Sequence, residues 1–317
     1  MRSAFRYRIE THVARIVLAI GLMTPLILAS CVSGLYQKLT LGNRCIDEGK
    51  YDEAIEAFSG AIALAPGDPA GYFGRAIAYS AKQKYQFAIA DYTRVIELAP
   101  SPQPYFCRGA CYAHLDDFDK AIADFTKAIQ YNNQDPLAYC YRGEAYRSKG
   151  ELDEAIRDFT RAIEIDPDLA PAFMGRGIAH SRDGEYQLAI DDYSRVIEID
   201  PENADAYNGR GFDYLKMNEV DLALPDINHA LDLDPENAPA WDSRAVYYFM
   251  TGRYDLAIQD STNAIEIDPT IAEHIYNRAR SYAAIGEKDS AIADLRRVLE
   301  LDPGYEGASE LLAELGG

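Results

Sequence analysis

Basic residues are scarce in this chain. It has 31 Lys and Arg against 51 Asp and Glu among 317 residues, a formal net charge of −20. Such an acidic chain repels the phosphates of nucleic acids and of anionic lipids. We therefore expect no nucleic-acid partner and no docking on a membrane through basic patches, and we read the acidity as favouring solubility.

The chain also lacks the motifs that mark common catalytic sites. It has no Gly-rich phosphate loop, no HExxH and no nucleophile elbow. Its many carboxylates recur at positions expected on exposed faces or in the first turns of helices, where solvation is the ordinary interpretation. We predict that the protein is not an enzyme and has no cofactor and no metal.

Long apolar runs are missing as well. The run at residues 16–29, IVLAIGLMTPLILA, is interrupted by Pro25 and is too short for a comfortable membrane span. An arginine-bearing start precedes it, and small residues follow it. A charged start, a short apolar run and a small-residue site are typical of an export signal.

The end of this run, Leu28-Ala29-Ser30-Cys31, resembles the lipobox of bacterial lipoproteins. The resemblance implies that residues 1–30 are removed and that Cys31 carries lipid, which anchors the chain to a membrane of the bacterial envelope. In Gram-negative lipoproteins, Asp directly after the lipidated Cys favours the inner membrane. This chain has Val32 there, which favours the outer membrane and a periplasmic location. An uncleaved anchor and cleavage without lipid remain alternatives.

The rest of the chain repeats at intervals of 34 residues. Numbered so that a proline falls at position 32, eight repeats occupy 35–68, 69–101, 102–135, 136–169, 170–203, 204–237, 238–271 and 272–305. Position 20 is always Ala and position 8 is always Gly or Ala, which lets two helices cross closely. The proline, which seven of the eight repeats have, ends the second helix, and a frequent Gly at position 15 suits the turn between the helices. Residues 306–317 predict a capping helix.

Small residues at positions 8 and 20, aromatics at 4, 11 and 24 and Pro at 32 resemble the tetratricopeptide repeat (TPR). The resemblance covers 35–305. It implies an all-α superhelical TPR solenoid whose concave groove is lined mainly by the first helix of each repeat. A solenoid of this kind presents an extended concave surface for binding.

Two charged positions recur together. Repeats two to eight have Arg at position 7 and Asp at position 23, namely Arg75 with Asp91, Arg108 with Asp124, Arg142 with Asp158, Arg176 with Asp192, Arg210 with Asp226, Arg244 with Asp260 and Arg278 with Asp294. Both positions neighbour the small-residue crossing, so we predict a partly buried ion pair in each repeat. A row of arginines that binds an acidic ligand is the alternative, and the rule that buried charges are paired disfavours it.

The TPR resemblance implies which positions face the groove. In this chain they supply Phe73, Ile77, Phe106, Cys140, Glu144, Arg147, Met174, Ile178, Arg182, Asn208, Phe212, Val246, Phe249, Met250 and Tyr276. No repeat has the Lys and Asn pair of the family's carboxylate clamp. An apolar, aromatic surface suits a peptide with hydrophobic anchors, although some of these residues are also expected to pack against neighbouring repeats.

The cysteines after Cys31 leave three alternatives. Cys107, Cys111 and His114 share one helix face and Cys140 begins the next repeat, so a metal site is conceivable. A disulfide between Cys107 and Cys140 is the second alternative. Burial as small apolar residues is the third, and we favour it.

Together these features predict a protein-interaction scaffold or adaptor. It would be tethered to a membrane and bind a peptide or protein partner in its groove, for assembly or proteolysis in the cell envelope. A soluble periplasmic protein resembling a chaperone and a metal-binding factor are the alternatives, and the sequence does not indicate an oligomeric state.

Overall fold

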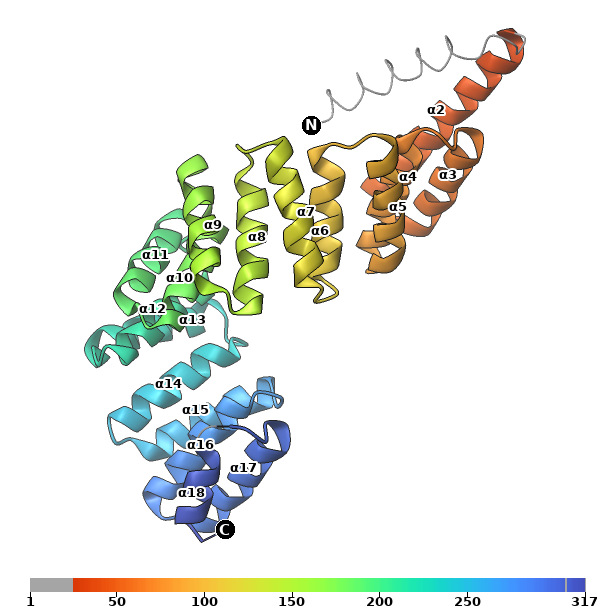
Figure 1. Cartoon of the computed structure of the whole chain (residues 1–317). Helices are drawn as coiled ribbons and strands as arrows, with labels where there is room; N and C mark the ends of the chain where they lie inside the picture. The colour runs from red at the N-terminus through yellow and green to blue at the C-terminus, as the bar shows by residue number, and fades with distance from the viewer. Residues whose placement is uncertain (1–24, 306, 317) are drawn as a thin grey trace. The chain divides into compact units, whose positions relative to one another are not determined.

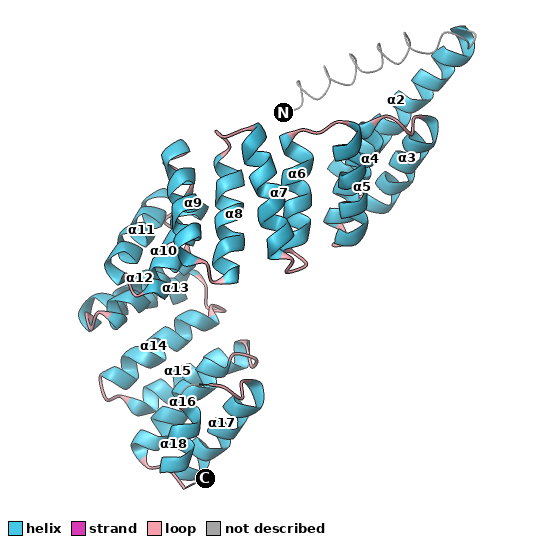
Figure 2. Ribbon diagram, viewed as in Figure 1, coloured by secondary structure: helices cyan, strands magenta, loops and turns pink. Residues whose placement is uncertain are grey.

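A computed structural model describes residues 25–305 and 307–316, with side chains from residue 33 onward. Most of the expected signal segment 1–30, and the side chain of Cys31, lie outside this description. All regular elements in the described ranges are helices (Figure 2). None of the helices searched there has the length and apolarity needed to cross a membrane. The described residues form two compact units that divide after Glu151, and each unit is described by itself.

The first unit is a series of antiparallel helix pairs. Its helices are α2 (Pro25–Asp47), α3 (Tyr51–Leu64), α4 (Pro69–Ala81), α5 (Tyr85–Leu98), α6 (Pro102–Ala113), α7 (Phe118–Tyr131) and α8 (Pro136–Lys149). Helices α2/α3, α4/α5 and α6/α7 are the first three repeats, and α8 is the first helix of the fourth. Each helix packs against the next along the chain, as α6 and α7 illustrate (Figure 1).

The second unit continues the same pattern. Its helices are α9 (Leu152–Ile165), α10 (Ala170–Asp183), α11 (Tyr186–Ile199), α12 (Ala204–Lys216), α13 (Val220–Leu233), α14 (Ala238–Met250), α15 (Tyr254–Ile267), α16 (Ala272–Ile285), α17 (Lys288–Leu301) and α18 (Ala308–Glu314). Helix α9 completes the fourth repeat, and the pairs from α10/α11 to α16/α17 are the fifth to eighth. The short α18 lies within the expected capping segment 306–317.

The turn between the two helices of a repeat has one conformation throughout. Glycine occupies it with positive φ in five repeats, for example Gly184 at 84°. In the other three repeats Gln83, Asp116 and Asn218 adopt φ of 56–62° at the same position. The repeat therefore imposes a left-handed residue here even where the side chain disfavours it.

The core of each repeat lies at the helix crossing. The alanines at position 20, from Ala54 to Ala291, are fully buried. A methyl group added at Gly109 would lie 3.0 Å from Phe125, and one added at Gly177 would lie 2.9 Å from Tyr193. Small residues at position 8 thus make room for the large residue at position 24, which fixes how the two helices cross.

Candidate peptide-binding surfaces

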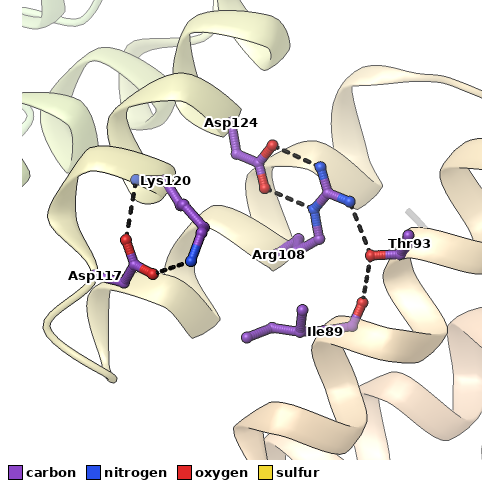
Figure 3. A network of polar contacts seen from close by, with 6 residues as sticks. All are labelled: Ile89, Thr93, Arg108, Asp117, Lys120 and Asp124. Carbon is purple, nitrogen blue, oxygen red and sulfur yellow. Dashed lines mark hydrogen bonds and ion pairs between the residues drawn. The ribbon is translucent and has the colours of Figure 1, made fainter.

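The arginine at position 7 holds the first helix of each repeat to its neighbours. In the third repeat, Arg108 on α6 donates from Nε and Nη2 to the Asp124 carboxylate on α7, at 2.7 and 2.8 Å (Figure 3). Its Nη1 donates to Thr93 Oγ1 on α5 at 2.8 Å. The Thr93 hydroxyl in turn donates to the Ile89 carbonyl at 2.7 Å. Hydrogen bonding to Asp124 is the main reason that the pKa of Arg108 is raised.

The same ion pair forms in six repeats, with N···O distances of 2.7–2.8 Å. The pairs are Arg75 with Asp91, Arg108 with Asp124, Arg176 with Asp192, Arg210 with Asp226, Arg244 with Asp260 and Arg278 with Asp294. The seventh, Arg142 with Asp158, would join the two units and stays a prediction. Because each of these six arginines already has a carboxylate partner, they do not form an open row for an acidic ligand. The alternative interpretation is therefore wrong for these six.

The ladder consists of partly buried pairs, as predicted, and its two partners differ in burial. The six paired arginine side chains are 16–22% exposed. The aspartates are buried instead, each with 4–9% of its surface exposed: Asp91, Asp124, Asp158, Asp192, Asp226, Asp260 and Asp294. The short carboxylate lies at the helix crossing and is covered there, whereas the longer arginine extends past the crossing toward the preceding repeat. A carboxylate covered in this way depends on its arginine for compensation of its charge.

Sequence reasoning missed the third member of this arrangement. Each arginine at position 7 also donates from Nη1 to the side chain at position 25 of the preceding repeat, which is Ser59, Thr93, Thr126, Thr160, Ser194, Asn228 or Thr262. A hydroxyl or amide recurring at position 25 was the signal that could have revealed it. The ladder therefore links successive repeats as well as the two helices of one repeat.

In the first unit, the predicted groove residues are shared between core and surface. Phe73 packs edge-on against Tyr92, with ring centroids 5.7 Å apart. Phe106 lies against Phe125 and Tyr141 at 5.6 and 5.2 Å. Ile77, like both phenylalanines, is half-buried. These residues supply apolar surface, but they also stabilise their own repeats.

Polar groove candidates of the first unit behave differently. Arg147 and Glu144 pair with each other at 2.6 Å. Cys140 is only 4% exposed, which corrects its expected place on the groove surface. The prediction failed because a thiol is small enough to be covered completely by neighbouring helices.

In the second unit the predicted residues are more varied. Met174, Ile178, Asn208, Phe212, Val246, Phe249 and Tyr276 are half-buried, whereas Arg182 and Met250 are exposed. Asn208 holds a buried Oδ1 atom that has no hydrogen-bond partner. An unpartnered buried acceptor costs free energy, and because this atom has almost no exposed surface, a group bound on the surface does not reach it.

A hollow of about 310 Å³ lies in the second unit beside two predicted residues, Phe249 on α14 and Tyr276 on α16. Arg280 on α16 also lines it, and its guanidinium lies 4.3 Å from the Phe249 ring centroid and 5.7 Å from that of Tyr276. The remaining lining comes from α16 and from α18 and the residue before it, including Leu311, Glu310 and Glu314.

Arg280 differs from the ladder arginines because no carboxylate in the described part of the chain lies within ion-pair distance of it. Glu310 and Glu314 share the hollow without reaching it. Stacking on aromatic rings leaves the edge of a guanidinium open for a hydrogen-bond acceptor. The sequence predicted a capping helix but did not reveal Arg280 or the place of α18 in this hollow, since the contact of a capping segment with a groove residue follows from the fold and not from the repeat period.

The cysteines do not form a metal site. Cys111 Sγ lies 3.3 Å from Ser80 Oγ, and the His114 ring stacks on Tyr85 at 4.7 Å. Burial raises the pKa of Cys107 to about 11 and that of Cys140 to about 12, which disfavours the thiolate that a metal requires. No group of three His, Cys, Asp or Glu side chains in the described ranges is placed to hold a metal. The metal-site alternative is therefore wrong.

The disulfide alternative is wrong as well, because Cys107 and Cys140 are free thiols. Cys45 and Cys111 are free and buried. The cysteines thus fill the core as small apolar residues, as we had favoured.

The paired helices, their crossing and their ladder define an array of helical hairpin repeats. Models of the tetratricopeptide repeat match residues 69–102, 102–135, 136–169, 209–270 and 272–305, and a TPR repeat model matches 42–83 and 182–218. The chain belongs to the tetratricopeptide repeat family and has its all-α solenoid fold.

Solved structures with the same fold include the APC/C hetero-tetramer Cut9–Hcn1, with a TM-score of 0.67 and 17% identity over 86% of this chain and 54% of that one. A tetratricopeptide repeat protein from Parabacteroides merdae has a TM-score of 0.58 and 18% identity, over 90% of this chain and 100% of its own. The Hsp70-Hsp90 organizing protein of Triticum aestivum is 39% identical over 59 residues, 19% of this chain and 10% of that protein. The chain thus spans a small part of that relative and about half of the Cut9–Hcn1 chain.

Proposed function

We propose that this protein is an interaction scaffold that binds a peptide segment of a partner protein on the first helices of its repeats. The observation that carries the proposal is the hollow beside Phe249 and Tyr276, where Arg280 is stacked on aromatic rings and forms no ion pair with a carboxylate of the described residues. A hollow of about 310 Å³ is at the lower end of the ligand-pocket range and suits an anchoring side chain of a peptide.

The anchor would place apolar surface on Phe249 and Leu311 and an acceptor, either a carbonyl or a carboxylate, against the guanidinium of Arg280. Aromatic and arginine side chains are also the types that dominate binding energy in protein interfaces.

Crosslinking pull-down from native membranes tests this proposal. Phe249→Ser and Arg280→Ala should each remove the same partner from the recovered proteins. Arg296→Ala, which changes an exposed arginine on α17, is the matched control and should recover the partner as the natural protein does. Recovery of the same proteins with all three variants would contradict groove binding.

We further propose that the scaffold is tethered to an envelope membrane by lipid on Cys31, with residues 1–30 removed. The order of the export signal and the Leu28-Ala29-Ser30-Cys31 junction support this. Intact mass separates it from the alternative of a soluble periplasmic protein resembling a chaperone. A tethered chain begins at residue 31 with added acyl mass, and Cys31→Ser abolishes that mass, whereas a soluble chain has a cleaved start and no acyl mass.

A further inference from the structure

The second unit presents an apolar edge at the turns inside its repeats. Leu188, Leu222 and Leu256 occupy position 19, at the start of α11, α13 and α15, and Met217 and Ile285 occupy position 14 at the end of α12 and α16. These five side chains, which we call the apolar edge, are each 39–51% exposed. Single exposed apolar residues are ordinary, but five along one edge of four successive repeats indicate an interaction surface.

The first unit shows how close these two positions lie. There, Lys82 at position 14 reaches Asp52 at position 18 of the preceding repeat, at 2.5 Å. Lys149 reaches Asp119 in the same way, at 2.8 Å. A position-14 side chain therefore lies beside the first turn of the preceding repeat's second helix. By this register, Met217 lies beside the turn that carries Leu188.

The same register places Ile285 beside the turn that carries Leu256. In two repeats of the second unit, Met217 and Ile285 thus stand at position 14, where Lys82 and Lys149 of the first unit form ion pairs, while position 18 of the preceding repeats keeps Gln187 and Asp255. In the first unit, Leu115 and Phe87 are exposed at the equivalent positions 14 and 19. Neither arrangement is needed for the helix crossing, which lies at positions 8 and 20. The exchange changes the surface and leaves the fold as it is.

The border of the apolar edge is acidic. The four turn segments 182–188, 216–222, 250–256 and 284–290 contain seven acidic residues, Asp183, Glu185, Glu219, Asp221, Asp255, Glu287 and Asp289, against four basic ones. None of the seven carboxylates forms an ion pair within the described residues. A second copy of this edge or an anionic lipid surface would bring like charges together, which disfavours both.

We propose that the apolar edge docks an amphipathic basic helix of a partner protein. Aliphatic side chains of that helix would cover the three leucines, and its flanking lysines or arginines would meet the seven carboxylates. A helix fits better than an extended strand, because the described residues of this unit form no sheet edge to which a strand could add. The three leucines do not line the hollow at Arg280, so the proposal does not depend on peptide binding there.

The test uses a defined probe, a fluorescent 18-residue helical peptide with leucines on one face and lysines on the other. The full chain, held in zwitterionic nanodiscs, is titrated into the peptide and followed by anisotropy, with empty discs as the blank. Leu188→Gln/Leu222→Gln/Leu256→Gln should weaken binding by about tenfold or more. Phe87→Gln is the matched control, since Phe87 is 61% exposed at position 19 of the first unit and should leave binding unchanged.

A second variant guards against a trivial loss of folding. Gln187→Asp/Met217→Lys rebuilds the ion pair of Lys82 and Asp52 on the second unit, so it should fold normally and bind the probe less tightly. Unchanged binding by the triple variant would overturn the proposal, and so would equal binding of a peptide with the same composition in scrambled order. A dimer in sedimentation that the triple variant abolishes, or binding to anionic vesicles that it abolishes, would assign the edge to the other occupants instead.

Discussion

Removing one carboxylate from the ladder should destabilise the protein strongly. In the Arg108/Asp124 pair the side chains are 16% and 7% exposed, and two hydrogen bonds of 2.7 and 2.8 Å join them. Breaking a buried pair costs about 3–5 kcal/mol, because one charge stays behind without its partner. Arg108 keeps Thr93 and some contact with water, so Asp124→Ala should lower the free energy of unfolding by about 3 kcal/mol.

Urea unfolding followed by circular dichroism measures this loss. Hydrogen exchange of α6 and α7 adds a local reading, since repeat arrays can unfold in stages. Asp119→Ala is the control. Asp119 also forms an ion pair, with Lys149, but its side chain is 82% exposed. It should leave the urea midpoint unchanged.

A double variant separates lost pairing from lost packing. Arg108→Met/Asp124→Leu removes both charges and should recover most of the stability, since apolar pairs often replace buried ion pairs without loss. The reasoning is refuted if Asp124→Ala unfolds like the natural protein, or if the double variant is as unstable as the single one.

Two further predictions concern a buried carboxyl and a strained turn. Asp213 is fully buried, accepts from Ser181 Oγ at 2.6 Å and has a pKa raised by burial to about 6. The folded state then binds its proton more tightly than the unfolded state, so this group's contribution to stability falls as pH rises from about 4 to about 6. Asp213→Asn should be more stable than the natural protein at about pH 8, by about 1–3 kcal/mol, and an equal difference in urea midpoint at about pH 4 would contradict this. Gln83→Gly should raise the free energy of unfolding by about 0.5–1 kcal/mol, because glycine adopts the φ of 57° at this turn without strain. Gly184→Gln should lower the free energy of unfolding by a similar amount. Urea midpoints that move in the same direction for both variants would contradict the turn argument.

The features that the sequence predicts well all follow from its 34-residue period. Ala at position 20, Gly or Ala at position 8 and, in repeats two to eight, Arg and Asp at positions 7 and 23 recur so strictly that each is expected to meet the same neighbour from repeat to repeat. Position 25 recurs more loosely, as Ser, Thr or Asn, because any of the three can accept from a guanidinium. That looseness is why the link between repeats became visible only in the structure.

The depth of burial is less predictable than the pairing. The period showed that Arg and Asp meet, but it did not show that the aspartates would be covered more completely than the arginines. Burial depends on side-chain length as well as on position, since a short carboxylate stays within the crossing and a long guanidinium stem leaves it. The pair is therefore a buried anion held by a half-buried cation.

The candidate sites are less predictable for a related physical reason. A groove position predicts the direction in which a side chain points but not how far neighbouring residues bury it. Cys140 is therefore buried, and Phe106 packs against the core residue Phe125. The hollow at Arg280 needs α18 to form one wall, and no repeat position specifies that contact. The sequence thus predicted that Phe249 and Tyr276 face the groove, but it did not predict the hollow beside them or Arg280 in it.

The repeat positions differ in whether their side chains already have interaction partners within the protein. The charged and polar side chains at positions 7, 23 and 25 pair with one another inside the array, as Arg108 does with Asp124 and Thr93. Among the described residues, Arg280 at position 9 forms no ion pair with a carboxylate, and Leu222 at position 19 is half exposed. Both stand at positions where the repeats differ. Because a bound partner can gain free energy only from groups that the fold leaves unsatisfied, recognition by this protein must depend on the positions that vary.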